Sequence, residues 1–223
     1  MKSNYIAQGW LVVVLSLSFG AALAGVETWL RPLIEANKLA ATIRQIPALV
    51  QGADSAASAK VKPLVVSVGE GAARARYEAF RALTGEGKQV GWVIKAGGKG
   101  FAGKIELLIG LDAPAERITG LHILEQVETP GLGDKIHEGD AQNKGFLWAF
   151  YNHHPDASRP LEVVKSAPDP GKPNAIQAVT GATISSRSVC NIVNDALSKP
   201  LRGALRAASA AAGNEPSARG GKE

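Results

Sequence analysis

An uncharged stretch near the amino terminus constrains this chain more than any other feature of its sequence. Residues 6–26 contain no Asp, Glu, Lys or Arg over 21 positions, and ten of these positions are Ile, Leu, Val or Phe. A helix of about 20 apolar residues is long enough to cross a bilayer. We therefore expect a short segment at 1–5 followed by a single transmembrane anchor at 6–26.

A cleaved signal peptide is the alternative to a retained anchor. Lys2, the apolar run and the small residues around Ala22 and Ala24 resemble the three regions of such a peptide. We favour the anchor because the run is longer than the apolar core of a typical signal peptide. The charges do not fix its orientation, since Lys2 precedes the stretch and Arg31, Lys38 and Arg44 follow it.

The single cysteine, Cys190, limits the redox chemistry that this chain can support. It excludes an intramolecular disulfide, a CxxCH haem attachment, a four-cysteine iron–sulfur cluster and a cysteine-rich zinc site. We expect Cys190 to be a buried small hydrophobe on a helix. The net charge of +5 is not gathered into a basic cluster with aromatic residues, so we expect no nucleic-acid partner.

The remainder reads as an α+β domain. Three strand-like runs at 89–96, 104–111 and 118–127 are separated by short turns, which favours an antiparallel meander. A shorter strand is expected at 64–68, and 72–83 reads as a helix or a mixture of strand and helix. An amphipathic helix beginning near Ser185 closes the domain.

The chain divides further by composition. Residues 27–63 are expected to form a membrane-proximal helix, covering 33–46 and ended by Pro47, and then a small-residue linker at 52–60. The domain proper is expected at 64–202, with an aromatic cluster near 146–151 that favours core packing. Residues 203–223 have no large apolar side chain after Leu205, which predicts a disordered tail.

One glycine-rich stretch imitates a nucleotide-binding motif. Residues 98–104 satisfy GxxxxGK, but Ile105 stands where a Ser or Thr is needed and the stretch precedes a strand. We reject a phosphate-binding P-loop there and expect a tight turn between strands.

Two other stretches carry more information. Residues 180–186 (TGATISS) place hydroxyls and small residues at a helix start, where free N–H groups and the helix dipole can bind phosphate. The alternative is N-capping by Thr183, Ser185 or Ser186, and the residues alone favour capping. Residues 128–135 (ETPGLGDK) form a turn that exposes Leu132 between two glycines and could meet a flat ligand.

This pair of motifs, in this order and behind one anchor, resembles the FMN-binding domain of the RnfG family, the G subunits of the Rnf ion-translocating electron-transport complex. The same domain occurs in NqrC, the C subunit of the sodium-pumping NADH:quinone reductase. The resemblance extends from the anchor to about Lys199. It implies FMN attached covalently, through its phosphate, to the hydroxyl of Thr183 by a separate flavin transferase.

The resemblance also implies the rest of the site. Thr183 would be an acceptor of the cofactor, and no residue is expected to be catalytic or to bind a metal. The expected FMN-binding residues, besides Thr183, are Thr180, Gly181, Ala182, Ser186, Thr129, Gly131, Leu132, Gly133 and Phe101. Gln177 departs from the family pattern, because the transferase usually reads an acid at this position.

The resemblance implies an electron carrier within a complex that couples electron flow between ferredoxin and NAD to ion transport. The expected partners are the other Rnf subunits, the flavin transferase and the lipid bilayer. The expected location is a bacterial inner membrane, crossed once, with most of the chain in the periplasm. Two alternatives remain: a membrane-anchored FMN protein outside Rnf, such as a sensor or another reductase subunit, or a non-redox assembly subunit with a vestigial motif.

Overall fold

The computed structural model describes residues 5–68, 75–137, 145–155, 159–169 and 171–213. The chain divides between Thr42 and Ile43 into two compact units. The first is formed by most of a long helix. The second contains the last turns of that helix, the sheet and the remaining helices.

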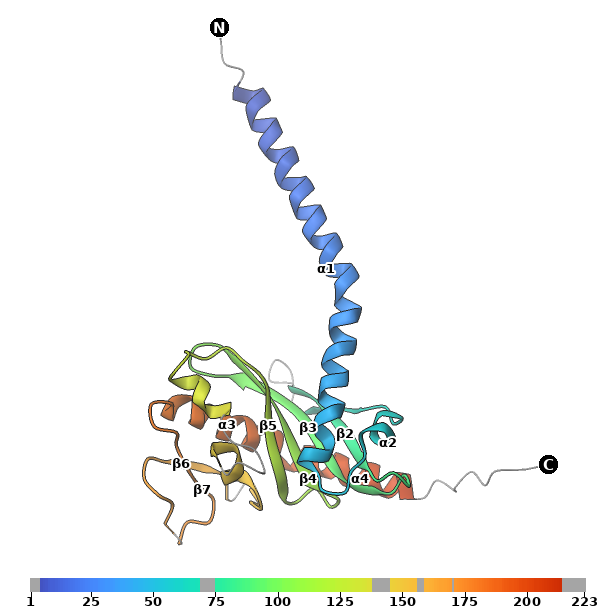
Figure 1. The fold of residues 1–223 in the computed structure, drawn as a ribbon, viewed down its shortest axis with the longest axis vertical. Coiled ribbons are helices and arrows are strands. Elements are labelled where there is room, and N and C mark those ends of the chain that lie inside the picture. Colours follow the sequence, from blue (N-terminus) through green and yellow to red (C-terminus); the bar gives the residue numbers. More distant parts are fainter. Residues whose placement is uncertain (1–4, 69–74, 138–144, 156–158, 170, 214–223) are drawn as a thin grey trace, which may run out of the picture. The chain divides into compact units, whose positions relative to one another are not determined.

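The first helix, α1 (Tyr5–Leu49), runs without interruption through Pro32 and Pro47 (Figure 1). The predicted separate helix at 33–46 is therefore part of a longer one, and its predicted end at Pro47 is wrong. A proline inside a helix removes one hydrogen bond and commonly kinks or breaks the helix, but both prolines lie within α1. The last turn is held because Ile46 and Leu49 are buried in the second unit.

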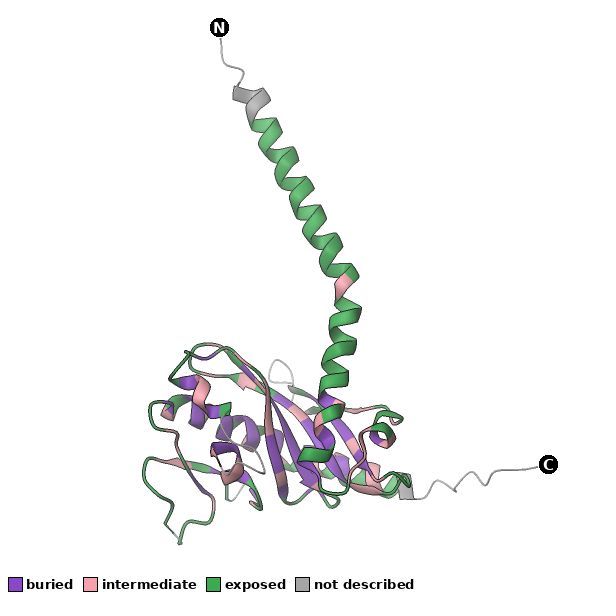
Figure 2. Cartoon of the chain, in the orientation of Figure 1, coloured by how far each residue is buried: buried purple, intermediate pink, exposed green. Residues whose placement is uncertain are grey.

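Helix α1 is long and apolar enough to cross a membrane, by length and composition. The large apolar side chains between Trp10 and Phe19 are exposed along its surface (Figure 2). Such a surface is suited to hydrocarbon, where an α-helix satisfies its own backbone polar groups. A signal sequence meets the same criteria, so the helix itself does not decide between anchor and signal peptide.

The second unit is built on a five-stranded sheet. Its strands are β1 (Leu64–Val68), β2 (Ala75–Leu83), β3 (Gln89–Lys99), β4 (Lys104–Asp112) and β5 (Ile118–Gln126). Their order in the sheet follows the chain, and every neighbouring pair is antiparallel. The predicted meander and the α+β class are confirmed.

Strand β2 corrects the prediction of a helix, or a helix–strand mixture, at 72–83; residues 72–74 of that range lie outside the described residues. Ala79 and Phe80 are both buried, although they point to opposite faces of the sheet. A strand buried on both faces loses the alternation of polar and apolar residues by which strands are recognised.

Each face of the sheet has its own apolar core. One core is formed by the end of α1 and the side chains of β2, β3 and β4 that face it, including Ile46, Phe80, Val93 and Leu108. The larger core lies on the other face, between the sheet and the helices α3 (Thr183–Ala196) and α4 (Lys199–Gly213). Trp92 is the largest fully buried side chain there.

Short elements complete the unit. They are α2 (Ser55–Ala59) within the predicted linker, the 3-10 helices η2 (Gly133–His137) and η3 (Phe146–Phe150), and the parallel pair β6 (Glu162–Val164) and β7 (Ala175–Gln177). In η3, the buried rings of Phe146 and Phe150 meet edge to face, with centroids 5.3 Å apart. The core packing predicted for the aromatic cluster holds for these two residues.

Helix α4 corrects the prediction of a disordered tail from residue 203. Residues 203–213 are its last turns, while 214–223 lie outside the described residues. Leu205 is fully buried, and the Ser209 hydroxyl accepts a hydrogen bond from the Trp92 indole N–H at 3.2 Å. A helix rich in alanine needs few large side chains to dock, because alanine costs little side-chain entropy.

We predict that Leu205→Ala lowers the free energy of unfolding of the second unit by about 2–5 kcal/mol, as expected for a fully buried leucine. Denaturant titration of the full chain in detergent, followed by tryptophan fluorescence, measures this change. Ala207→Ser, at an exposed position in the same turn, is the control and should leave the midpoint nearly unchanged. Equal midpoints for the two variants would show that α4 does not contribute to the core.

Candidate functional site

A buried carboxylate joins three segments that are distant in sequence. These are the turn between β3 and β4, the loop that follows β5 and the start of α3. Glu128 Oε1 accepts hydrogen bonds from the N–H groups of Phe101 at 2.8 Å and Ala102 at 3.3 Å. Its Oε2 accepts one from the Ser185 hydroxyl at 2.7 Å. Both motifs and the Phe101 turn therefore meet at Glu128.

Two glycines permit this close approach to Glu128. A Cβ on Gly100 would lie 2.0 Å from Glu128 Oε1, and one on Gly133 would lie 2.5 Å from Oε2. Contacts this short require a shift of the backbone or of the carboxylate. Glycine is thus needed at both positions by the packing around Glu128.

The start of α3 has no side-chain cap. Ala182 occupies the N-cap position, Ser185 donates to Glu128, and the Ser186 hydroxyl accepts from the Val179 N–H at 3.1 Å. The capping expected of Thr183, Ser185 or Ser186 is therefore wrong. Within the described part of the chain, the N–H groups of residues 183–185 have no acceptor. This leaves donors and the positive end of the helix dipole open beside the Thr183 hydroxyl.

The two motifs adjoin at Leu132 and Gly181. A Cβ on Gly181 would lie 3.5 Å from Leu132 Cδ2, an ordinary contact distance. Gly181 has φ of +84° and Gly131 has φ of +75°, a region that favours glycine. The Thr129 carbonyl accepts from the N–H groups of Leu132 at 3.1 Å and Asp134 at 3.4 Å, which closes the loop around Gly131.

Apolar side chains at these segments are exposed to an unusual degree. Phe101 is 62% exposed, Val127 61%, Leu132 52% and Ile184 53%. Thr180 is exposed and Thr183 is partly buried, whereas Ala182 and Ser186 are buried. Uncapped N–H groups beside apolar side chains suit a ligand with an anionic end and a flat apolar body, such as FMN.

Sequence reasoning did not predict the bond between Glu128 and Ser185. The register of β4 and β5 places Glu128: Gln126 pairs with Ile105, so residue 128 falls opposite the turn that contains Phe101. Nothing in the local sequence marks Ser185 as the partner of a carboxylate. Gln177, the departure from the family pattern, lies exposed at the end of β7.

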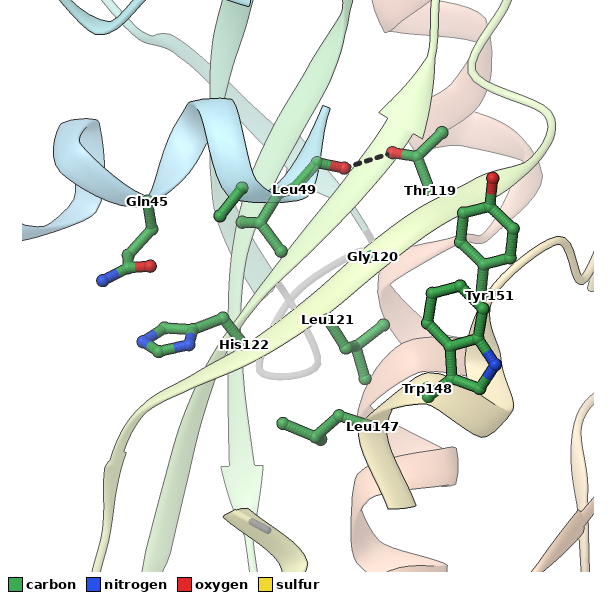
Figure 3. A pocket seen from close by; sticks show the side chains of 10 residues that line it. Gln45, Leu49, Thr119, Gly120, Leu121, His122, Leu147, Trp148 and Tyr151 are labelled. Carbon is green, nitrogen blue, oxygen red and sulfur yellow. Dashed lines mark hydrogen bonds between the residues drawn. The ribbon is translucent and has the colours of Figure 1, made fainter. Parts of the chain in front are cut away.

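A cavity of about 270 Å³ lies apart from these three segments, where residues 45–49 meet β5 and η3 (Figure 3). The Thr119 hydroxyl donates to the Leu49 carbonyl at its edge, at 2.7 Å. Trp148 and Tyr151 stack in its wall with centroids 4.6 Å apart. None of the residues that line it belongs to the Phe101 turn, the loop after β5 or the start of α3.

The described residues contain no group of three or more His, Cys, Asp or Glu side chains that could hold a metal ion. His122 lines the cavity, and the His137 ring contacts the Asp134 carbonyl. Cys190 is buried in the larger core, and burial raises the pKa of its thiol to about 12.

Residues 100–198 match the family of FMN-binding domains. The G subunit of the Na⁺-translocating ferredoxin:NAD⁺ oxidoreductase complex of Acetobacterium woodii is 38% identical over 109 residues, which are 48% of each chain. The G subunit of the proton-translocating ferredoxin:NAD⁺ oxidoreductase complex of Clostridium ljungdahlii is 36% identical over 110 residues, or 49% of this chain and 53% of that one. The chain therefore spans about half the length of these relatives.

Two solved structures share the fold. Shewanella oneidensis NqrC has a TM-score of 0.51 at 22% identity, and the likeness covers 59% of this chain and 62% of that one. The C subunit of the Na⁺-translocating NADH-quinone reductase of Parabacteroides distasonis has a TM-score of 0.52 at 20% identity, covering 79% and 96%. These structures confirm the predicted fold. The domain match and the two relatives confirm the resemblance that the two motifs predicted.

The buried thiol gives a direct test of the packing beneath the site. A pKa raised to about 12 keeps Cys190 protonated at about pH 8, where an ordinary thiol of pKa near 8.5 is partly ionised. We predict that iodoacetamide does not label the native chain at this pH and labels it fully after denaturation. Cys190 is the only cysteine, so mass spectrometry reads the result directly. Rapid labelling of the native chain would contradict the packing of α3.

Proposed function

We propose that this chain is an electron-carrying subunit of a membrane ion-translocating oxidoreductase complex of the Rnf type, with FMN attached through its phosphate to Thr183. The observation that carries this proposal is the uncapped start of α3. Its first N–H groups are open beside a threonine hydroxyl, within a region that matches the FMN-binding domains.

The start of α3 would hold the phosphate. Three N–H groups and the positive end of the helix dipole stabilise an anion at this position, as at other helix starts that bind phosphate. Thr183 is the first residue of the helix and lies next to them. In the attachment step, Thr183 Oγ1 would bond to the flavin phosphorus of a donor that carries FMN in a phosphoanhydride. The anhydride P–O bond would break, the rest of the donor would leave as a phosphate with the electrons of that bond, and the Thr183 hydroxyl proton would be released.

The loop after β5 and the Phe101 turn would hold the flavin ring. Leu132 lies against Gly181 and presents an exposed apolar side chain next to the helix start. Phe101, Val127 and Ile184 are further exposed apolar side chains on the three segments. Burying them against a ring excludes water from one side of it. FMN supplies the redox chemistry when bound, and the protein supplies its position and surroundings.

The names of the relatives support the assembly and the membrane location in this proposal. They are subunits of ferredoxin:NAD⁺ oxidoreductase complexes that translocate Na⁺ or protons. We propose that this chain likewise passes electrons between ferredoxin and NAD, with the other subunits as partners and a flavin transferase for maturation. Helix α1 would cross the inner membrane once and leave the second unit in the periplasm.

The covalent link is tested by flavin fluorescence of the denatured protein in a gel. From cells that also make the flavin transferase, we predict a fluorescent wild-type band and a dark Thr183→Ala band, because the acceptor oxygen is lost. Thr180→Ala removes the same kind of hydroxyl three residues away and should remain fluorescent. A dark wild-type band would overturn the proposed attachment and favour the alternative of a non-redox assembly subunit.

The location is tested by reporters fused after Glu223. With the second unit in the periplasm, we predict an active alkaline phosphatase fusion and a non-fluorescent GFP fusion, because the phosphatase needs the oxidising periplasm for its disulfides. Fusions after Lys2 should give no phosphatase activity. The reverse pattern at the carboxyl end would contradict the proposed orientation.

A further inference from the structure

We propose that Glu128 is a positioning residue of the flavin site, and that it acts on Thr183 through Ser185. This inference rests on the proposed attachment of FMN to Thr183. Glu128 does not supply a reacting atom. Its carboxylate joins the Phe101 turn, the loop after β5 and the first turn of α3, which carries Thr183 as its first residue.

Burial and hydrogen bonding show that Glu128 is fixed in place. It is 7% exposed, and its carboxylate accepts two backbone N–H groups on one oxygen and the Ser185 hydroxyl on the other. Its own N–H donates to Gln126 Oε1 at 2.6 Å. A buried carboxylate with three donors has little freedom to turn, because each rotation would leave donors without acceptors.

The link to Thr183 passes through one turn of helix. Ser185 is 2% exposed, and its only described side-chain partner is Glu128. Thr183 lies two residues earlier, so the bond from Ser185 fixes the helix turn on which Thr183 stands. On the far side of Glu128, Phe101 and Ala102 are held at the other edge of the site.

Glycine placement supports the same role. A Cβ on Gly133 would meet both Glu128 Oε2, at 2.5 Å, and Ser185 Oγ, at 2.7 Å. Gly133 thus leaves room for the bond between them. The loop, the carboxylate and the helix fit together only with a glycine at this point.

Two substitutions at Glu128 separate its positioning role from its charge. Glu128→Ala leaves three donors without an acceptor. Glu128→Gln keeps one oxygen for the Phe101 and Ala102 N–H groups and turns an amide donor toward the Ser185 oxygen, which can accept. The glutamine therefore keeps the hydrogen bonds that join the three segments and removes the charge. Ser185→Ala removes a single bond and leaves the Phe101 turn in place.

The experiment measures covalent flavin per protein for the full chain made together with the transferase. We expect Glu128→Ala to lower incorporation about tenfold or more, Ser185→Ala to lower it by a smaller factor, and Glu128→Gln to keep more than about half. Glu116→Ala, at an exposed acid in the turn before β5, is the control and should match the wild type. Circular dichroism in the far ultraviolet checks that each variant is folded.

A second readout uses the flavin that does become attached. Visible circular dichroism reports how firmly the ring is held, and we expect it to weaken in Ser185→Ala and to persist in Glu128→Gln. If Glu128→Ala fails to fold, the comparison of Ser185→Ala with Glu128→Gln still tests the positioning role. Wild-type incorporation and dichroism in Ser185→Ala and in every folded Glu128 variant would overturn the positioning role. A wild-type chain without flavin would instead overturn the proposed function.

Discussion

The hydrogen bonds to Glu128 are the interaction on which the arrangement of the site depends. They connect residues 27 and 57 positions apart in the sequence, from a strand turn to a helix start. The turn is rich in glycine and the helix start has no side-chain cap, so Glu128 supplies a contact that neither segment has within itself. A single buried carboxylate satisfies donors from both, and the loop that carries it becomes the centre of the site.

This arrangement differs from one selected for stability alone. A capped helix start and buried apolar side chains would each stabilise the fold, by about 1 kcal/mol for a typical cap. The chain instead leaves N–H groups open at α3 and keeps Phe101, Val127, Leu132 and Ile184 exposed. Local features that conflict with folding rules tend to gather at functional sites. A bound FMN would relieve both, by placing an anion at the helix start and a ring over the apolar side chains.

Sequence patterns predicted the parts of this fold that depend on local signals. Strands β4 and β5 were located to within one residue, because Gly, Asp and Pro mark their turns. Strand β2 was not recognised, since burial on both faces removes its alternation. The last turns of α4 were missed because their docking depends on Leu205 and on the bond between Ser209 and Trp92, which is far away in sequence.

Prediction of the site was likewise limited to what local sequence signals reveal. The motifs at 128–135 and 180–186 were recognised from residue types, and the structure brings them together at Leu132 and Gly181. The role of Glu128 was not recognised, because two of its three donors are backbone N–H groups, which every residue except proline has. Residue type therefore identifies what can bind a ligand more readily than what holds the binding residues in place.

The position of α3 explains how the chain could hold a redox group at a fixed place. Ser185 binds Glu128 near the start of the helix, and Ile192, two turns later, packs so closely on β3 that a Cβ on Gly98 would lie 2.6 Å from it. The helix is thus fixed at two points against rigid elements. In the proposed function, a covalent phosphate link then sets the distance of the flavin from α3, and the apolar loop sets the tilt of its ring. Electron transfer depends on both the distance and the tilt of the flavin. In this arrangement, different parts of the site would set the two.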